Sequence, residues 1–250
     1  MTTSTDFGRE ELLIVTVARL LEGCGHIAVG ASSPIPGSAA LLVRERSAGA
    51  TKVSVLGSRK NNFFTNGGVE LFDCAAQGRI DAFFLGGGQI DGQGNINLVG
   101  TGDYPTNQVR WPGCFGSSYL YFLVPRVILF REEHSRRVMV PKVDFVSAPG
   151  VSPANHYRPG GPHAMVTNLA LFDFNKQKQR FRLVSVHPGH TAEEVADNTG
   201  FDYDQPDEVP TTPGPDAETL ALIRGPVAAE IAETYPRFAE RVFPGAVAAA

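Results

Sequence analysis

Apolar runs alternate with amphipathic stretches along the first hundred residues of the chain. Apolar side chains recur at helical spacing over residues 10–22 and 67–78, which predicts two helices. Short apolar runs at residues 27–30, 52–56 and 80–85 have the length of buried strands. Because these strands alternate with helices, the pattern predicts βαβ units and a mainly parallel sheet.

Shorter elements follow to the end of the chain. They are a helix that Pro36 opens, a helix over residues 119–124, strands over 127–130, 164–174 and 180–186, an extended segment over 138–146, and a short helix that Thr191 caps. The strands over 164–174 and 180–186 read as an edge hairpin. A closing helical region over residues 217–242 is interrupted at Gly225-Pro226 and bends near Pro236.

The fold class that these elements predict is α/β, with a single open, mainly parallel sheet and flanking helices. Its 250 residues suit one domain over residues 1–250, and residues 200–250 would supply a docking segment and the closing helices. Hydrophobic residues make up 42% of the chain and charged residues 19%, which argues for a sizeable core and against disorder.

Charge and cysteine content narrow the partners. The net charge of −4 makes nucleic acid or an anionic membrane an unfavourable partner. The first residues lack the basic and apolar regions of a signal peptide, and no apolar run reaches the length of a membrane span. The three cysteines lack CxxC spacing, so we expect reduced thiols, no metal site and a cytoplasmic location.

The loop at residues 85–97 is the first candidate for a binding site. It contains five glycines, among them Gly87, together with Gln89, Asp91 and Asn95. Ligands of open α/β sheets bind outside the carboxyl ends of the strands, and glycine lets the backbone approach a ligand closely. The alternative, which composition alone slightly favours, is a tight turn in which Asp91 caps its own loop.

Two other loops carry candidate chemistry. The polar loop at residues 57–62 holds two adjacent cations that could bind a substrate carboxylate or an oxyanion, or could belong to a solvated turn. Its candidate residues are Ser58, Arg59, Lys60 and Asn61. Gly113 and Gly116 precede a predicted helix, where backbone N–H groups can face an oxyanion. An ordinary first helical turn is the alternative, and spacing alone favours it.

Four motifs then occur in order along the chain. They are Gly86-Gly-Gly-Gln-Ile-Asp91 with Gly94-Asn95, Gly113-Cys-Phe-Gly116, Glu133-His-Ser-Arg-Arg137 with Lys142-Val-Asp-Phe-Val146, and Leu183-Val-Ser-Val-His-Pro-Gly189 followed by Thr191-Ala-Glu-Glu-Val195. In this order they resemble the β subunits of class I CoA-transferases, in the glutaconate-CoA-transferase-like branch, over nearly the whole chain. The resemblance implies a CoA-transferase-like fold and a distinct α subunit as partner, in a heterotetramer.

Two departures from the family pattern bear on the activity. The transferases carry a nucleophilic glutamate after the strand that corresponds to residues 53–56, and this glutamate forms an enzyme–CoA thioester. Here the loop contains Ser58 and Arg59 and no acid. Phe115 also replaces the second glycine of the family's Gly-x-Gly-Gly loop. Within the family, the pattern is most similar to the β subunits of steroid-ring-degrading CoA hydrolases.

This resemblance implies hydrolytic opening of a carbocyclic ring in a β-keto acyl-CoA, a C–C bond cleavage. Gly113 and Gly116 would contact the oxyanion, and the general base would come from the α subunit, because the loop after the strand offers none. The substrate-binding residues would be Ser58, Arg59, Lys60, Asn61, Gly87, Gln89, Asp91 and Asn95. We expect no cofactor, since CoA enters as part of the substrate.

Three other functions are compatible with the sequence. A CoA-transferase with a relocated nucleophile would form a covalent enzyme–CoA species. A non-catalytic scaffold subunit would tolerate changes at Arg59, Gly116 and Gln89. A sugar-phosphate isomerase is the most distant alternative, because no glycine-rich run bears a suitably placed lysine or hydroxyl.

Overall fold

The computed structural model describes residues 6–244 and divides into two compact units. The first unit comprises the residues up to Gly67, the segment Ile80–Ala82 and the residues from Pro213 onward; the second comprises Gly68–Arg79 and Phe83–Thr212. The predicted domain includes residues 1–5 and 245–250, which lie outside the described residues. A single domain over residues 1–250 stays a prediction.

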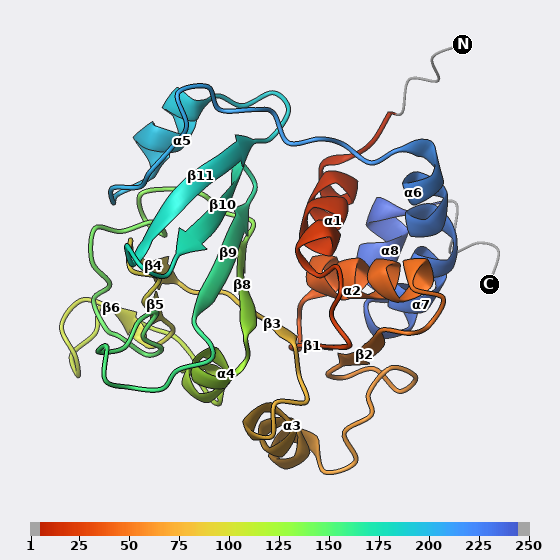
Figure 1. Ribbon diagram of the computed structural model, residues 1–250, viewed down its shortest axis with the longest axis horizontal. Helices are drawn as coiled ribbons and strands as arrows, with labels where there is room; N and C mark the ends of the chain where they lie inside the picture. The colour runs from red at the N-terminus through yellow and green to blue at the C-terminus, as the bar shows by residue number, and fades with distance from the viewer. Residues whose placement is uncertain (1–5, 245–250) are drawn as a thin grey trace. The chain divides into compact units, whose positions relative to one another are not determined.

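In the first unit, parallel strands are accompanied by helices (Figure 1). The elements are α1 (Arg9–Leu20), β1 (His26–Val29), α2 (Pro34–Arg46), β2 (Lys52–Val55) and the first residue of β3 (Ala82–Leu85). Ile27 of β1 pairs with Val53 of β2 and with Ala82. All four residues of β1 are buried, as predicted for an apolar strand covered on both faces.

The second helix begins earlier than predicted. Pro34, not Pro36, occupies the first helical position of α2. Proline is tolerated there because the first N–H groups of a helix have no intrahelical partner. Pro36 lies within the same first turn, so its missing N–H costs no helical hydrogen bond either.

The closing helical region confirms both predicted interruptions. It consists of α6 (Ala217–Leu222), a π-helix at Ile223–Val227, α7 (Ala228–Thr234) and α8 (Pro236–Val242). Pro226 lies in the π-helix, where a wider turn accommodates the missing N–H and the proline ring. These helices lie beside α1 and α2 in the first unit (Figure 1).

The second unit carries the longer strands. They are β8 (Arg126–Arg131), β9 (Pro162–Thr167), β10 (Ala170–Asn175) and β11 (Arg180–Val186), together with the last three residues of β3. The strand order of the sheet is β11-β10-β9-β8-β3-β1-β2. β8 and β9 are parallel, whereas β9, β10 and β11 are antiparallel neighbours. This confirms a mainly parallel seven-stranded sheet and the hairpin at its edge.

Two strand predictions in this unit are wrong in detail. The run 164–174 forms two strands rather than one, because the Thr167 hydroxyl accepts the N–H groups of Leu169 and Ala170, both at 3.2 Å, and so makes a turn. The run 138–146 is irregular and has a single bridge, between Met139 and Ile90. Its apolar side chains fill the core from a loop, which apolar periodicity alone cannot distinguish from a strand.

The remaining elements are short. Two hairpins pair β4 (Gln89–Ile90) with β5 (Ile96–Asn97) and β6 (Gly100–Thr101) with β7 (Val109–Arg110). The helices are α3 (Gly67–Ala76), α4 (Ser117–Leu123) and α5 (Ala192–Asn198), the last capped by the Thr191 hydroxyl as predicted. Val69 of α3, expected to be buried, is exposed. Within residues 6–244 no helix has the length and apolarity to cross a membrane.

Candidate functional site

The glycines after β3 allow β4 and β5 to fold back on each other. A Cβ at Gly87 would lie 2.8 Å from both the Gln89 carbonyl oxygen and Cγ2 of Ile96, and a Cβ at Gly88 would lie 2.2 Å from Trp111. Side chains cannot occupy such space, so the hairpin's own packing requires glycine here. The turn considered as the alternative for this loop is present, and ligand contact by Gly87 stays a prediction.

Gln89 lies in a buried polar knot. Its Oε1 accepts from Asn97 Nδ2 at 2.8 Å and from the Asp144 N–H at 3.0 Å, and its Nε2 donates to Asp144 Oδ2 at 3.1 Å. Asn97, which is fully buried, also donates to the Gly100 carbonyl at 2.7 Å and accepts from the Val99 N–H at 2.9 Å. The Gln89 amide therefore fixes the surrounding loops, and its role toward a substrate remains a prediction.

Asp91 and Asn95 close the turn between β4 and β5. Asp91 Oδ1 accepts the N–H groups of Gln93 at 3.1 Å and Asn95 at 3.0 Å, while its Oδ2 accepts from Asn95 Nδ2 at 3.0 Å. Asn95 Oδ1 in turn accepts the Gly150 N–H at 3.0 Å. These bonds make an Asx-type turn that also holds the start of the long loop after residue 149.

The two candidate amides before α4 differ. Gly113 has φ +103°, a conformation that favours glycine, but its N–H donates to the Leu98 carbonyl at 3.1 Å. The Gly113 N–H is thus unavailable to an oxyanion in this structure, which corrects the predicted pair. Gly116 is the N-cap residue of α4, and its N–H donates to no group among residues 6–244. The predicted oxyanion contact narrows to Gly116.

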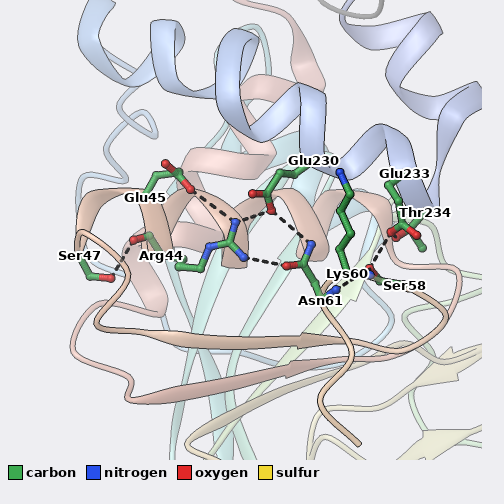
Figure 2. A network of polar contacts seen from close by, with 9 residues as sticks. All are labelled: Arg44, Glu45, Ser47, Ser58, Lys60, Asn61, Glu230, Glu233 and Thr234. Atoms are coloured by element: carbon green, nitrogen blue, oxygen red, sulfur yellow. Dashed lines mark hydrogen bonds and ion pairs between the residues drawn. The ribbon is translucent and has the colours of Figure 1, made fainter. Parts of the chain in front are cut away.

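The loop after β2 is held by a glutamate of α7. Ser58 Oγ donates to Glu233 Oε2 at 2.6 Å, and the Arg59 N–H donates to Glu233 Oε1 at 2.9 Å (Figure 2). The same Ser58 oxygen accepts the N–H groups of Lys60 at 3.2 Å and Asn61 at 2.9 Å. Since Ser58 is only 5% exposed, its hydroxyl is the centre of a hydrogen-bonded turn.

A second glutamate of α7 holds the end of this loop. Asn61 Nδ2 donates to Glu230 Oε2 at 3.2 Å, and Asn61 Oδ1 accepts from Arg44 Nη1 at 2.8 Å. Arg44 also pairs directly with Glu230 (Figure 2). Glu230 and Glu233 are three residues apart and share one helix face. The loop at 57–62 is therefore braced at both ends by α7.

Two cations project from this braced loop. Arg59 and Lys60 are both exposed, and neither charged group makes a hydrogen bond or ion pair within the described part of the chain. A fixed backbone with free cations suits the binding of an anionic ligand group. Ser58 and Asn61, by contrast, are buried and committed to the brace.

The charge of Glu233 is stabilised by its neighbours. The hydrogen bond from Ser58 is the main cause that lowers the pKa of Glu233, and the Arg59 N–H, the Thr234 hydroxyl and the Lys60 charge act in the same direction against partial burial. Sequence reasoning missed this residue. Its only signal was a pair of acids three positions apart, which is also common on a solvent-facing helix surface.

Two histidines of the second unit are structural. His134, expected at the surface or in a cap, is instead buried between the hydroxyls of Thr167 and Thr199, each at 2.9 Å. His187 contacts the Thr212 hydroxyl at 2.9 Å and the Thr167 carbonyl at 3.0 Å. Burial lowers the pKa of each to about 4. Among residues 6–244, no three His, Cys, Asp or Glu side chains gather as a metal site.

An open α/β sheet whose strand-end loops are glycine-rich and polar defines a ligand-binding α/β protein. Residues 11–198 match the Coenzyme A transferase family, and the chain belongs to that family. Family members are enzymes or enzyme subunits that act on CoA esters, so the predicted family and fold class are confirmed.

Three curated relatives are similar to this chain. The B-type subunit of the 3-oxoadipate CoA-transferase of Pseudomonas knackmussii is 34% identical over 59% of this chain and 58% of its own length. The B-type subunit of the glutaconate CoA-transferase of Acidaminococcus fermentans is 32% identical over 56% and 54%. The cholesterol ring-cleaving hydrolase IpdB subunit of Rhodococcus jostii is 37% identical over 62% of each. The chain thus spans 54–62% of the length of these relatives.

Two solved structures share the fold. The IpdAB structure of Rhodococcus jostii RHA1 has a TM-score of 0.77 at 28% identity and covers 88% of this chain and 94% of its own. The decarboxylase AibA/AibB has a TM-score of 0.75 and covers 95% and 99%, but at 22% identity it bears on the fold alone. Because one fold carries a decarboxylase as well, the activity has to be argued from the site.

Proposed function

We propose that this chain is the β subunit of a heteromeric acyl-CoA hydrolase that opens a carbocyclic ring of a β-keto, steroid-derived CoA thioester. The observation that carries the proposal is the loop after β2, where Ser58 and Arg59 stand and residues 57–62 include no carboxylate. A transferase of this family would need a nucleophilic carboxylate there. The 37% identity to an IpdB subunit, named as part of a cholesterol ring-cleaving hydrolase, supports the same function.

Hydrolytic ring opening takes three chemical events. Activated water adds to the ring ketone, and the tetrahedral oxyanion then expels the α-carbon as a thioester enolate, which is protonated. The product keeps CoA and gains one carboxylate. A positioned base contributes about 10²–10⁴-fold to such a reaction, and one oxyanion donor contributes about 10²–10³-fold.

The proposed roles follow from the groups that are free. The Gly116 N–H would stabilise an oxyanion, and Arg59 and Lys60 would bind anionic groups of the acyl-CoA. Glu233 is a poor general base, because three hydrogen bonds hold its pKa below the usual range of a glutamate. We therefore assign the base to a carboxylate of the partner α subunit.

The partner is proposed from the relatives. The transferases that resemble this chain are named as one of two subunit types, and the R. jostii structure is named IpdAB. An α subunit of the same family, in a heterotetramer, would complete the enzyme. CoA would be part of the substrate, and no separate cofactor is proposed.

One observation favours a second function. The Glu233 carboxylate lies against the loop after β2, at 2.6 Å from Ser58 Oγ. A lowered pKa keeps this group ionised, as a nucleophile must be. In that case Glu233 would attack the thioester carbonyl, release CoA thiolate, and then form a glutamyl–CoA thioester while the carboxylic acid leaves. The chain would then be a CoA-transferase β subunit.

Trapping of the enzyme–CoA species separates the two functions. The co-expressed complex is incubated with acyl-CoA, the thioester is reduced with borohydride, and the peptides are analysed by mass spectrometry. The hydrolase proposal predicts no modified peptide from this chain. A reduced Glu233, absent in Glu233→Gln and present in the control Glu240→Gln, would identify a transferase; Glu240 is exposed on α8.

A further inference from the structure

We propose that three aromatic side chains around Phe115 form a subsite for the alicyclic part of the acyl group. This aromatic cluster consists of Phe72 of α3, Phe115 and Tyr119 of α4. The ring centroids of Phe72 and Phe115 are 5.7 Å apart, and those of Phe72 and Tyr119 are 5.6 Å apart. The inference rests on the proposed function, because it assigns a substrate contact to the loop that carries Gly116.

The cluster is presented to solvent at an energetic cost. Phe115 is 90% exposed and has φ +41°, in the left-handed region where a residue with a Cβ is strained by about 1 kcal/mol or more. Tyr119 is 44% exposed. A large apolar ring held in water by a strained backbone is typical of a contact surface rather than of the core.

Two glycines make room for these rings. A Cβ at Gly116 would lie 2.1 Å from Cζ of Phe72, and a Cβ at Gly68 would lie 3.4 Å from Cζ of Phe115. Phe72 therefore occupies the space where residue 116 would carry a side chain, and Phe115 lies against the bare backbone of α3. The cluster is thus seated between two helices rather than attached to the end of a loose loop.

The chemistry of the cluster fits a carbocycle. No ion pair or cation–π contact within residues 6–244 involves its rings, so it offers nothing to the phosphates of CoA. The Tyr119 hydroxyl makes no hydrogen bond within the same residues and can meet an oxygen substituent of the ring. An apolar ring beside a carbonyl has the same arrangement as this cluster beside the Gly116 N–H.

The size of the cluster favours a small ligand over a protein. Fully buried aromatic side chains contribute about 150–250 Å² each, and only Phe115 here is almost fully exposed. A stable protein interface needs about 800 Å² on each partner. The cluster alone is too small for that, whereas it matches the face of one or two fused rings.

Binding of non-reactive CoA thioesters to the co-expressed complex tests the subsite. We expect Phe115→Ala to weaken cyclohexanecarbonyl-CoA about tenfold by calorimetry, and to change acetyl-CoA and free CoA less than twofold. Phe115→Gly, which also relieves the positive φ, should give the same selective loss without a lower unfolding temperature. The matched control is Phe63→Ala, since Phe63 is also exposed but belongs to the first unit.

Three outcomes would overturn the subsite. They are unchanged affinity for the cyclohexane thioester, an equal loss for all three ligands, and dissociation of the complex on gel filtration, which would make the cluster a contact with the partner subunit. Neither thioester probe contains a β-ketone, so neither can undergo ring opening. A failure of the proposed reaction therefore leaves this binding result readable, and a failure of the subsite does not bear on the reaction itself.

Discussion

The hydroxyl of Ser58 donates a 2.6 Å hydrogen bond to Oε2 of Glu233, although the two residues are 175 positions apart in the chain. Oε1 of the same carboxylate accepts the Arg59 N–H at 2.9 Å. The closing helices thereby fix the conformation of the loop after β2 (Figure 2). The loop lacks a carboxylate of its own but is held by one from α7.

Loss of the Glu233 charge should loosen this loop. Glu233→Gln replaces one acceptor oxygen by a donor, so either Ser58 or the Arg59 N–H loses its partner. We expect the free energy of unfolding to fall by about 1 kcal/mol, and hydrogen exchange to quicken at residues 58–61. Glu240→Gln, an exposed change on α8, should alter neither; equal effects of both variants would contradict the brace.

Arg59 should contribute to substrate binding rather than to stability. Its guanidinium is exposed and unpaired within the described residues, so Arg59→Gln should leave the unfolding temperature unchanged. If it contacts an anionic group, KM should rise about tenfold or more, and the salt dependence of KM should become shallower. Arg237→Gln, also exposed and on α8, is the control. Unchanged kinetics would instead support a scaffold role for this loop.

The polar knot at Gln89 should matter mainly for folding. Asn97→Ala removes the donor to the Gly100 carbonyl and the acceptor of the Val99 N–H in a fully buried place. We expect a loss of about 2–4 kcal/mol in the free energy of unfolding, because buried groups remain unpaired. Asn155→Ala, in an exposed loop, should cost less than about 0.5 kcal/mol. A similar small cost for both would show that the knot is dispensable.

The two buried histidines predict acid sensitivity. Burial lowers the pKa of His134 and of His187 to about 4 in the folded protein, whereas both return to about 6.5 on unfolding. Below pH 6.5 the unfolded chain therefore binds more protons, and stability falls as the pH drops from 6.5 toward 4. The loss is on the order of 2–3 kcal/mol for each histidine.

Urea unfolding of the complex at several pH values measures this effect. The slope of the unfolding free energy between pH 6.5 and 4.5 should be smaller in His134→Gln and His187→Gln than in the parent protein. A parent protein whose stability is constant over that range, or variants with the parent's slope, would contradict neutral buried histidines.

Local patterns account for the parts of the fold that were predicted correctly. The apolar periodicity of α1 and the short apolar runs of β1 and β2 are properties of adjacent residues, so the sequence alone indicates them. The run 138–146 was misread, because buried loop residues such as Met139 are as apolar as strand residues. The start of α2 was misplaced because two prolines fit within one first turn.

The candidate site depended more on contacts between distant residues. Asp91 and Asn95 are four positions apart, and the sequence already offered their turn as an alternative. Glu233 was invisible as a partner of Ser58, because only the packing of α7 brings it there. The loss of the Gly113 N–H to the Leu98 carbonyl likewise needed coordinates, since the loop composition suggests a free amide.

The most direct test of the central claim follows the fate of oxygen and CoA. The co-expressed complex is incubated with a cyclic β-keto acyl-CoA in ¹⁸O-water, and the products are analysed by mass spectrometry. Ring hydrolysis predicts one ¹⁸O atom in a new carboxylate of a product that still carries CoA. Transfer of CoA to an added carboxylic acid, with no labelled ring-opened thioester, would contradict the account and identify a CoA-transferase.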